Sequence, residues 1–119
     1  MIEMQNYFSR LSRNYPNVPI TYTDNGDSAT LIAVFPHIAL RYEILKNRNS
    51  ITIIQFNRIC RDHLSSNQWH LDFTREYSNF KGVFMNITAS MKRSLGSQVR
   101  MNNRQLHYPK HSLILEQTV

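Results

Sequence analysis

Two short clusters of cysteine and histidine contain the side chains that could bind a metal ion. Cys60 and His63 are separated by two residues, and His107 and His111 are separated by three. Thiolate and imidazole are typical zinc ligands at such short spacings. Cys60, however, falls on the apolar side of a predicted helix, and Pro109 prevents the two later histidines from pairing on one helical turn. We therefore predict no metal site.

The same histidines suggest two kinds of catalysis. Cys60 could act as a nucleophile with His63 or His70 as its base, if the fold supplied an orienting carboxylate. A small basic ribonuclease could instead use His70 or His107 as a base while arginine or lysine stabilises the phosphate charge. No motif typical of either reaction is present, and the three glycines stand singly, which excludes the usual nucleotide-binding loops. We predict no catalytic residues and no cofactor, with a ribonuclease as an alternative.

Positive charge is concentrated in the last third of the chain. The net charge is +6, and residues 1–76 contain eight Lys or Arg and seven Asp or Glu, whereas residues 77–119 contain six basic residues and only Glu116 as an acid. Basic, amide and aromatic side chains interleaved in this way are typical of phosphate contacts and base stacking. The predicted nucleic-acid-binding residues are Lys92, Arg93, Arg100, Arg104, His107, Tyr108, Lys110 and His111.

Other partners fit the same charge distribution. The basic residues could dock an acidic protein, or could simply keep a small protein soluble. Arginines earlier in the chain would extend the basic surface if the fold brought them to the same side. These are Arg10, Arg13, Arg41, Arg58 and Arg61.

Length and composition indicate one globular unit. The chain has 119 residues, of which 41% are hydrophobic and 18% charged, and it has a single cysteine. One cysteine cannot form an internal disulfide, which agrees with a reducing compartment. The N-terminal stretch lacks the apolar core of a secretory signal, and no run approaches the ~20 apolar residues of a membrane span. We expect a cytoplasmic protein that does not insert into membranes.

The first half of the chain predicts a helix followed by an antiparallel meander. Apolar residues recur at helical spacing over 2–14, and Pro16 ends that pattern. The tetrapeptide 24–27 contains Asn25 and Gly26, which favour a tight hairpin turn. Alternating or continuous apolar segments joined by short polar turns predict antiparallel strands. These strands are expected at 18–23, 29–35, 38–44 and 51–56.

The second half predicts a short helix, a fifth strand and a long helix. The short helix is expected at 57–64 and the strand at 68–73, with Trp69, Leu71 and Phe73 on one face. The long helix is expected at 74–96, with Thr74 as its N-cap and Gly96 as its end. A strand at 82–88 is the rival interpretation. The apolar stripe of the long helix consists of Tyr77, Phe80, Phe84, Ile87, Met91 and Leu95.

Together these elements predict an α+β domain over 1–96, with the long helix packed on the sheet. A basic C-terminal extension is expected over 97–119, with a short strand at 112–116. Segments such as Leu31 to Phe35 are apolar on both faces, so a single helical layer cannot cover the sheet. The first helix, the extension or a second subunit could supply the second cover. An uncovered face would bind a protein partner or form a homodimer, which is the alternative function.

Overall fold

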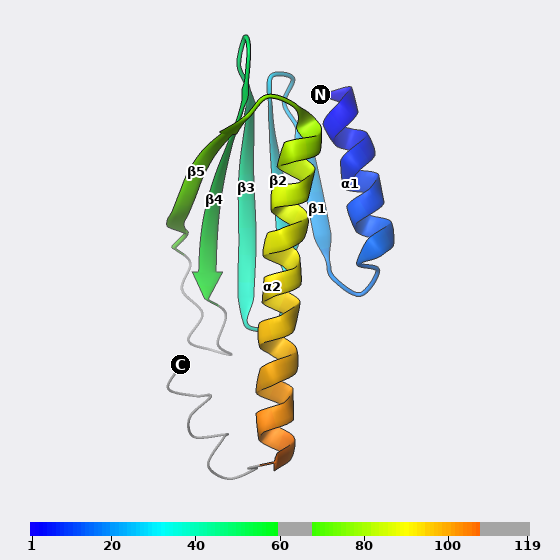
Figure 1. The fold of residues 1–119 in the computed structure, drawn as a ribbon, viewed down its shortest axis with the longest axis vertical. Helices are drawn as coiled ribbons and strands as arrows, with labels where there is room; N and C mark the ends of the chain where they lie inside the picture. The colour runs from blue at the N-terminus through cyan, green and yellow to red at the C-terminus, as the bar shows by residue number, and fades with distance from the viewer. Residues whose placement is uncertain (60–67, 108–119) are drawn as a thin grey trace.

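The computed structural model describes residues 1–59 and 68–107, with side chains described as far as Gly96. Helix α1 (Ile2–Asn14) comes first, a five-stranded antiparallel sheet follows, and helix α2 (Phe80–His107) comes last (Figure 1). The strands follow one another in the sheet in chain order, so the predicted α+β meander is confirmed. They are β1 (Ile20–Asp24), β2 (Ser28–Val34), β3 (Ile38–Lys46), β4 (Ile51–Ile59) and β5 (His70–Tyr77).

The first hairpin turns where the sequence predicts it. Gly26 has a φ of 94°, a conformation that side chains disfavour. Its N–H donates to Oδ1 of Asp24 at 2.9 Å, and the other oxygen of Asp24 lies 2.8 Å from the N-terminal amino group. The hairpin turn is thereby linked to the start of α1.

Both helices cover the same face of the sheet (Figure 1). Tyr7 of α1 stacks on Phe84 of α2 with ring centroids 4.8 Å apart, and Phe8 stacks on Tyr22 of β1 at 5.1 Å. Each large apolar side chain buried between helices and sheet contributes about 1.5–3 kcal/mol. The largest of these are Met4, Leu11, Leu31, Phe35, Tyr42, Ile44, Ile53, Val83, Ile87 and Met91.

The opposite face of the sheet, here called the open face, is also partly apolar. Ile32, Ile54 and Phe56 lie on it and are half-buried. No helix or strand among the described residues covers this face. Helix α1, one of the three predicted covers, cannot serve because its aromatic side chains pack with α2 on the other side.

The long helix was predicted correctly in kind, but both of its ends were wrong. Thr74 lies in β5, paired with Ile54 of β4. The capping residue is Asn79, whose Oδ1 accepts a hydrogen bond from the Gly82 N–H at 2.9 Å. At the other end α2 continues through Gly96 to His107. An isolated glycine costs a helix only ~1 kcal/mol, so it does not have to end one.

The short helix predicted at 57–64 is wrong over its first three residues. Residues 57–59 complete β4, where Arg58 pairs with Ala39 of β3. The rest of that predicted helix lies outside the described residues, as does the strand predicted at 112–116. The first 11 residues of the predicted C-terminal extension belong to α2.

Candidate functional site

The eight predicted nucleic-acid-binding residues divide at the end of α2. Lys92 and Arg93 are exposed on this helix, and residues 100, 104 and 107 belong to its last turns. Tyr108, Lys110 and His111 lie outside the described residues. Five of the eight are therefore placed on one element.

The continuation of α2 aligns four of these positions. Arg93, Arg100, Arg104 and His107 are spaced by seven, four and three residues. At 3.6 residues per turn these positions fall within an arc of about 60°, over about 21 Å of helix. We call them the basic stripe. Lys92 lies about 100° around the helix from Arg93, outside the stripe.

The basic stripe begins at the flank of the side of α2 that packs on the sheet. Arg93 lies about 120° around the helix from buried Ile87. The last turns of α2 also extend beyond the ends of the strands (Figure 1). The basic positions therefore lie on a projecting helix.

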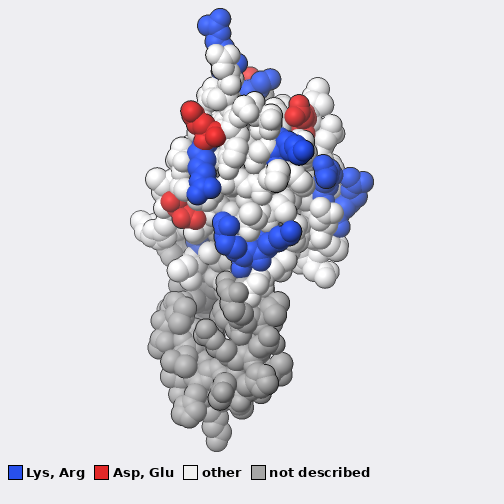
Figure 2. Space-filling model, in the orientation of Figure 1, with Lys and Arg blue, Asp and Glu red and all other residues white. Residues whose placement is uncertain are grey.

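Carboxylates do not neutralise the described part of this surface. The ion pairs among the described residues join the N-terminal amino group to Asp24 and Arg41 to Glu43. Neither pair involves Lys92 or Arg93. Figure 2 shows one group of basic side chains at the lower end of the helix-bearing face, beside the grey residues, and further basic side chains higher on this face together with the acidic ones.

The earlier arginines divide between the two faces of the sheet. Arg10 of α1 lies over the ring of Phe84, 4.8 Å from its centroid, and therefore on the helix-bearing side. Arg58 and Arg41 lie 4.7 and 5.9 Å from the ring centroid of Trp69, and Arg41 also pairs with Glu43 on the open face. Arg13, in the last turn of α1, belongs with Arg10 on the helix-bearing side. Arg61 lies outside the described residues.

A β-bulge changes the side-chain directions predicted for the fifth strand. Gln55 pairs with Phe73 and Phe56 pairs with Leu71, so Asp72 is an extra residue between them. Leu71 consequently lies on the open face and is 63% exposed, whereas Phe73 packs against the core. The predicted grouping of Leu71 with Phe73 is therefore wrong. The bulge allows Asp72 to reach the helix-bearing side, where it bonds to Gln55.

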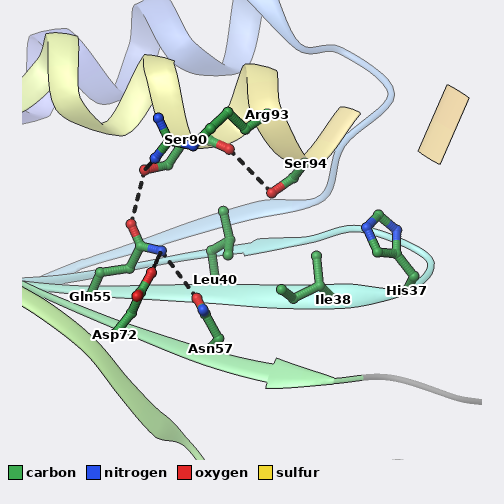
Figure 3. Close-up of a pocket in the computed structure, with 9 residues that line it drawn as sticks. All are labelled: His37, Ile38, Leu40, Gln55, Asn57, Asp72, Ser90, Arg93 and Ser94. Atoms are coloured by element: carbon green, nitrogen blue, oxygen red, sulfur yellow. Dashed lines mark hydrogen bonds between the residues drawn. The ribbon is translucent and has the colours of Figure 1, made fainter. Parts of the chain in front are cut away.

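A pocket of about 180 Å³ opens between α2 and the sheet on this side. Its residues come from the β2–β3 turn, from β3, β4 and β5, and from α2 (Figure 3). Most of the side chains around it are polar, unlike the apolar core beside it. They are His37, Ile38, Leu40, Gln55, Asn57, Asp72, Ser90, Arg93 and Ser94.

Gln55 is the centre of the hydrogen bonds in this pocket. Its Nε2 donates to Oδ1 of Asn57 and to Oδ2 of Asp72, both at 3.1 Å, and its Oε1 accepts from the Ser90 hydroxyl at 2.9 Å. Arg93 donates to the same Ser90 oxygen at 3.3 Å. Gln55 and Ser90 are each only 3% exposed. The guanidinium group of the basic stripe is thus connected to a buried polar network (Figure 3).

Burial changes the pKa of two groups at this site. It lowers the pKa of His37, whose Nδ1 is buried without a hydrogen-bond partner among the described residues. Burial also raises the pKa of the Tyr42 hydroxyl, although nearby Ser90 and Arg93 act in the opposite direction and Asp72 adds to the rise. Both groups are therefore neutral at pH 7.

The residues considered for metal binding and catalysis lie only partly within the described part of the chain. No group of three metal-ligating side chains occurs among residues 1–59 and 68–107. Cys60, His63 and His111 lie outside that part of the chain. Of the two histidines considered for RNA cleavage, His70 begins β5 and is exposed, and His107 ends α2.

Sequence reasoning missed the pocket, because its residues are far apart in the chain. The available signal was the presence of Gln55 and Ser90 within otherwise apolar segments.

No helix in the described part of the chain is both long and apolar enough to span a membrane. No protein-family model, curated protein or solved structure matches this chain.

Proposed function

We propose that this is a cytoplasmic nucleic-acid-binding protein whose basic stripe contacts the phosphate backbone. The observation that supports the proposal most strongly is the continuity of α2 through Gly96, which aligns three arginines and a histidine on one side of a projecting helix. Lys92 lies beside them, and Tyr108, Lys110 and His111 follow in the sequence. Cations spaced along one line can neutralise successive phosphates and release their counterions.

Salt dependence tests this proposal. Binding of a fluorescein-labelled single-stranded RNA of mixed sequence would be followed by fluorescence anisotropy over a range of salt concentrations. Three arginines that each neutralise one phosphate predict a slope of about −2 for log K against log salt. Arg100→Glu together with Arg104→Glu should weaken binding to every sequence alike and make the slope shallower by about 1 to 2.

The control reverses a charge elsewhere on the same helix. Lys81 is exposed in the first turn of α2, so Lys81→Glu alters the net charge without altering the stripe. It should leave the affinity nearly unchanged. Absence of binding at low salt would refute the proposal. Displacement of the RNA by poly-glutamate of equal charge, at equal concentration, would instead favour an acidic protein as the partner.

A second candidate function, self-association, is favoured by the open face. Ile32, Ile54 and Phe56 form an apolar surface there that no described element covers. A two-fold axis across the strands would place this apolar surface of one copy on that of the other.

Light scattering after size-exclusion chromatography tests this second function. If two copies pack through the open face, the wild-type protein is a dimer, and Ile54→Glu converts it into a folded monomer. The matched control is Ile2→Glu, because Ile2 is 80% exposed at the start of α1. A wild-type protein that is monomeric at all concentrations would exclude self-association.

A further inference from the structure

The pocket between α2 and the sheet adjoins the basic stripe through a shared residue. Arg93 is the first member of the stripe and also lines the pocket. Its guanidinium bonds to Ser90, so it is held at the boundary between them. A strand whose phosphates followed the stripe would pass the mouth of the pocket with a base within reach of it.

The hydrogen bonds within the pocket determine which atoms remain for a ligand. Gln55 uses its carbonyl oxygen and both amide hydrogens on Ser90, Asn57 and Asp72. Asp72 accepts through Oδ2 and Asn57 through Oδ1. Among the hydrogen bonds of the described residues, Oδ1 of Asp72 therefore remains as an acceptor and Nδ2 of Asn57 as a donor. Arg93 adds further donors at the rim.

The bulge in β5 is required for this arrangement. Without the extra residue, Asp72 would alternate with Phe73 and face the open side of the sheet. The bulge places its carboxylate instead on the side of Gln55. Bulges that redirect a side chain in this way are found next to binding sites more often than elsewhere.

The size of the pocket limits the ligand. A volume of about 180 Å³ corresponds to about six water molecules at ~30 Å³ each, which is enough for one nucleobase. Cytosine presents an amino group beside ring and carbonyl acceptors, whereas uracil presents a carbonyl beside a ring N–H. A carboxylate acceptor next to amide and guanidinium donors matches cytosine.

We propose that this pocket receives an unpaired cytosine base, whose amino group donates to Asp72 while its ring nitrogen and carbonyl accept from Asn57 and Arg93. The inference rests on the proposed binding of nucleic acid. The cytosine site adds that the nucleic acid is unpaired at this nucleotide and that the protein recognises the hydrogen-bonding edge of its base. The phosphates would still supply most of the affinity.

Binding of two labelled 12-nucleotide RNAs, one of cytidine and one of uridine, tests the base preference at pH 7.5. The cytidine RNA should bind about tenfold more tightly, which is the discrimination expected of a well-formed base contact. Asp72→Asn gives the pocket an amide that can donate to the uracil carbonyl, so the preference should disappear or reverse. The matched control is Glu76→Gln, which removes a charge from an exposed position of the same strand.

A second variant and a mononucleotide separate the pocket from the stripe. Asn57→Ala keeps the carboxylate and removes a donor, and should also bring the cytidine RNA to the affinity of the uridine RNA. Cytidine monophosphate should shift the NMR signals of the Asn57 and Gln55 side-chain amides, and uridine monophosphate should not. Thermal melting confirms that each variant is folded.

The outcomes distinguish the two proposals. Salt-dependent binding with equal affinity for the two RNAs, and no amide shifts with cytidine monophosphate, would overturn the cytosine site and leave the basic stripe intact. Loss of binding to both RNAs at low salt would overturn the nucleic-acid proposal itself. A cytidine preference that survives both pocket variants would show that the base is read elsewhere.

Discussion

Gln55 and Ser90 are the two buried polar residues in the described core, and the Ser90 hydroxyl donates a hydrogen bond to the Gln55 side-chain carbonyl. A buried amide without a partner is expensive, so the pair must form for the helix and the sheet to pack. The bond joins β4 to α2 across 35 residues of sequence. It therefore fixes the position of Arg93, one turn further along the helix, relative to the pocket.

Replacement of Ser90 tests this role. Ser90→Ala leaves the Gln55 carbonyl oxygen without a donor and should lower the free energy of unfolding by about 1–3 kcal/mol. The matched control is Ser94→Ala, because Ser94 donates only to the backbone carbonyl of Ser90. Its effect should stay below about 0.5 kcal/mol. Urea unfolding monitored by circular dichroism measures both, and equal losses for the two variants would contradict the role given to Gln55.

His37 provides a pH dependence at the other end of the pocket. Burial lowers its pKa below the ordinary value of 6.5, so the unfolded chain binds a proton there before the folded protein does. Stability should consequently fall as the pH drops from about 6.5 to the folded-state pKa. His37→Gln should reduce this slope in urea unfolding measured over a series of pH values. Equal slopes for the wild type and His37→Gln would refute this contribution.

At the scale of elements, the beginning of α2 depends on Tyr77, Asn79 and Gly82. Tyr77 fits the helical spacing of the predicted stripe, but it ends β5 and packs against the core beside the helix. Gly82, in the first turn of α2, lies under this tyrosine. A Cβ at Gly82 would lie 2.7 Å from Cδ1 of Tyr77. The cap is Asn79, directly before the first helical residue.

Gly82→Ala should therefore destabilise the protein, although alanine is the better helix former. The gain of ~1 kcal/mol in helix propensity is outweighed by an overpacking cost of about 1–3 kcal/mol. In a Tyr77→Ala background the same substitution should stabilise the protein, because the ring is gone. Urea denaturation of the four proteins forms a double-mutant cycle. A stabilising effect of Gly82→Ala in the wild type would contradict the packing described for Tyr77.

The strands were predictable because each has a local signal. Alternation of apolar residues and the Asn25–Gly26 turn placed the meander correctly, to within a few residues. The bulge at Asp72 has no such signal, since an extra residue in one strand is recognisable only from its partner strand. The pocket was unpredictable for the same reason. His37, Asn57, Asp72 and Arg93 come together only after the sheet and α2 have packed.

At the scale of the whole molecule, the packing of both helices on one face of the sheet creates three distinct regions. The packed interior stabilises the fold, the open face carries apolar and paired charged side chains, and the end of α2 projects beyond the sheet with its basic positions aligned. The sequence already showed the excess of positive charge in this region. The alignment of that charge depends on the path of the helix past Gly96, which sequence reasoning placed outside the helix.

The most direct test of nucleic-acid binding by an aligned stripe changes the helix without changing any charge. Gly96→Pro breaks α2 between Arg93 and Arg100, at a cost of about 3 kcal/mol to the last turns, whereas Gly96→Ala favours the helix by ~1 kcal/mol. Affinity for the same labelled RNA, measured by anisotropy at one low salt concentration, should be reduced in Gly96→Pro and equal or higher in Gly96→Ala. Equal affinity of the proline and alanine variants, with both folded, would contradict the central claim that continuity of this helix creates the binding surface.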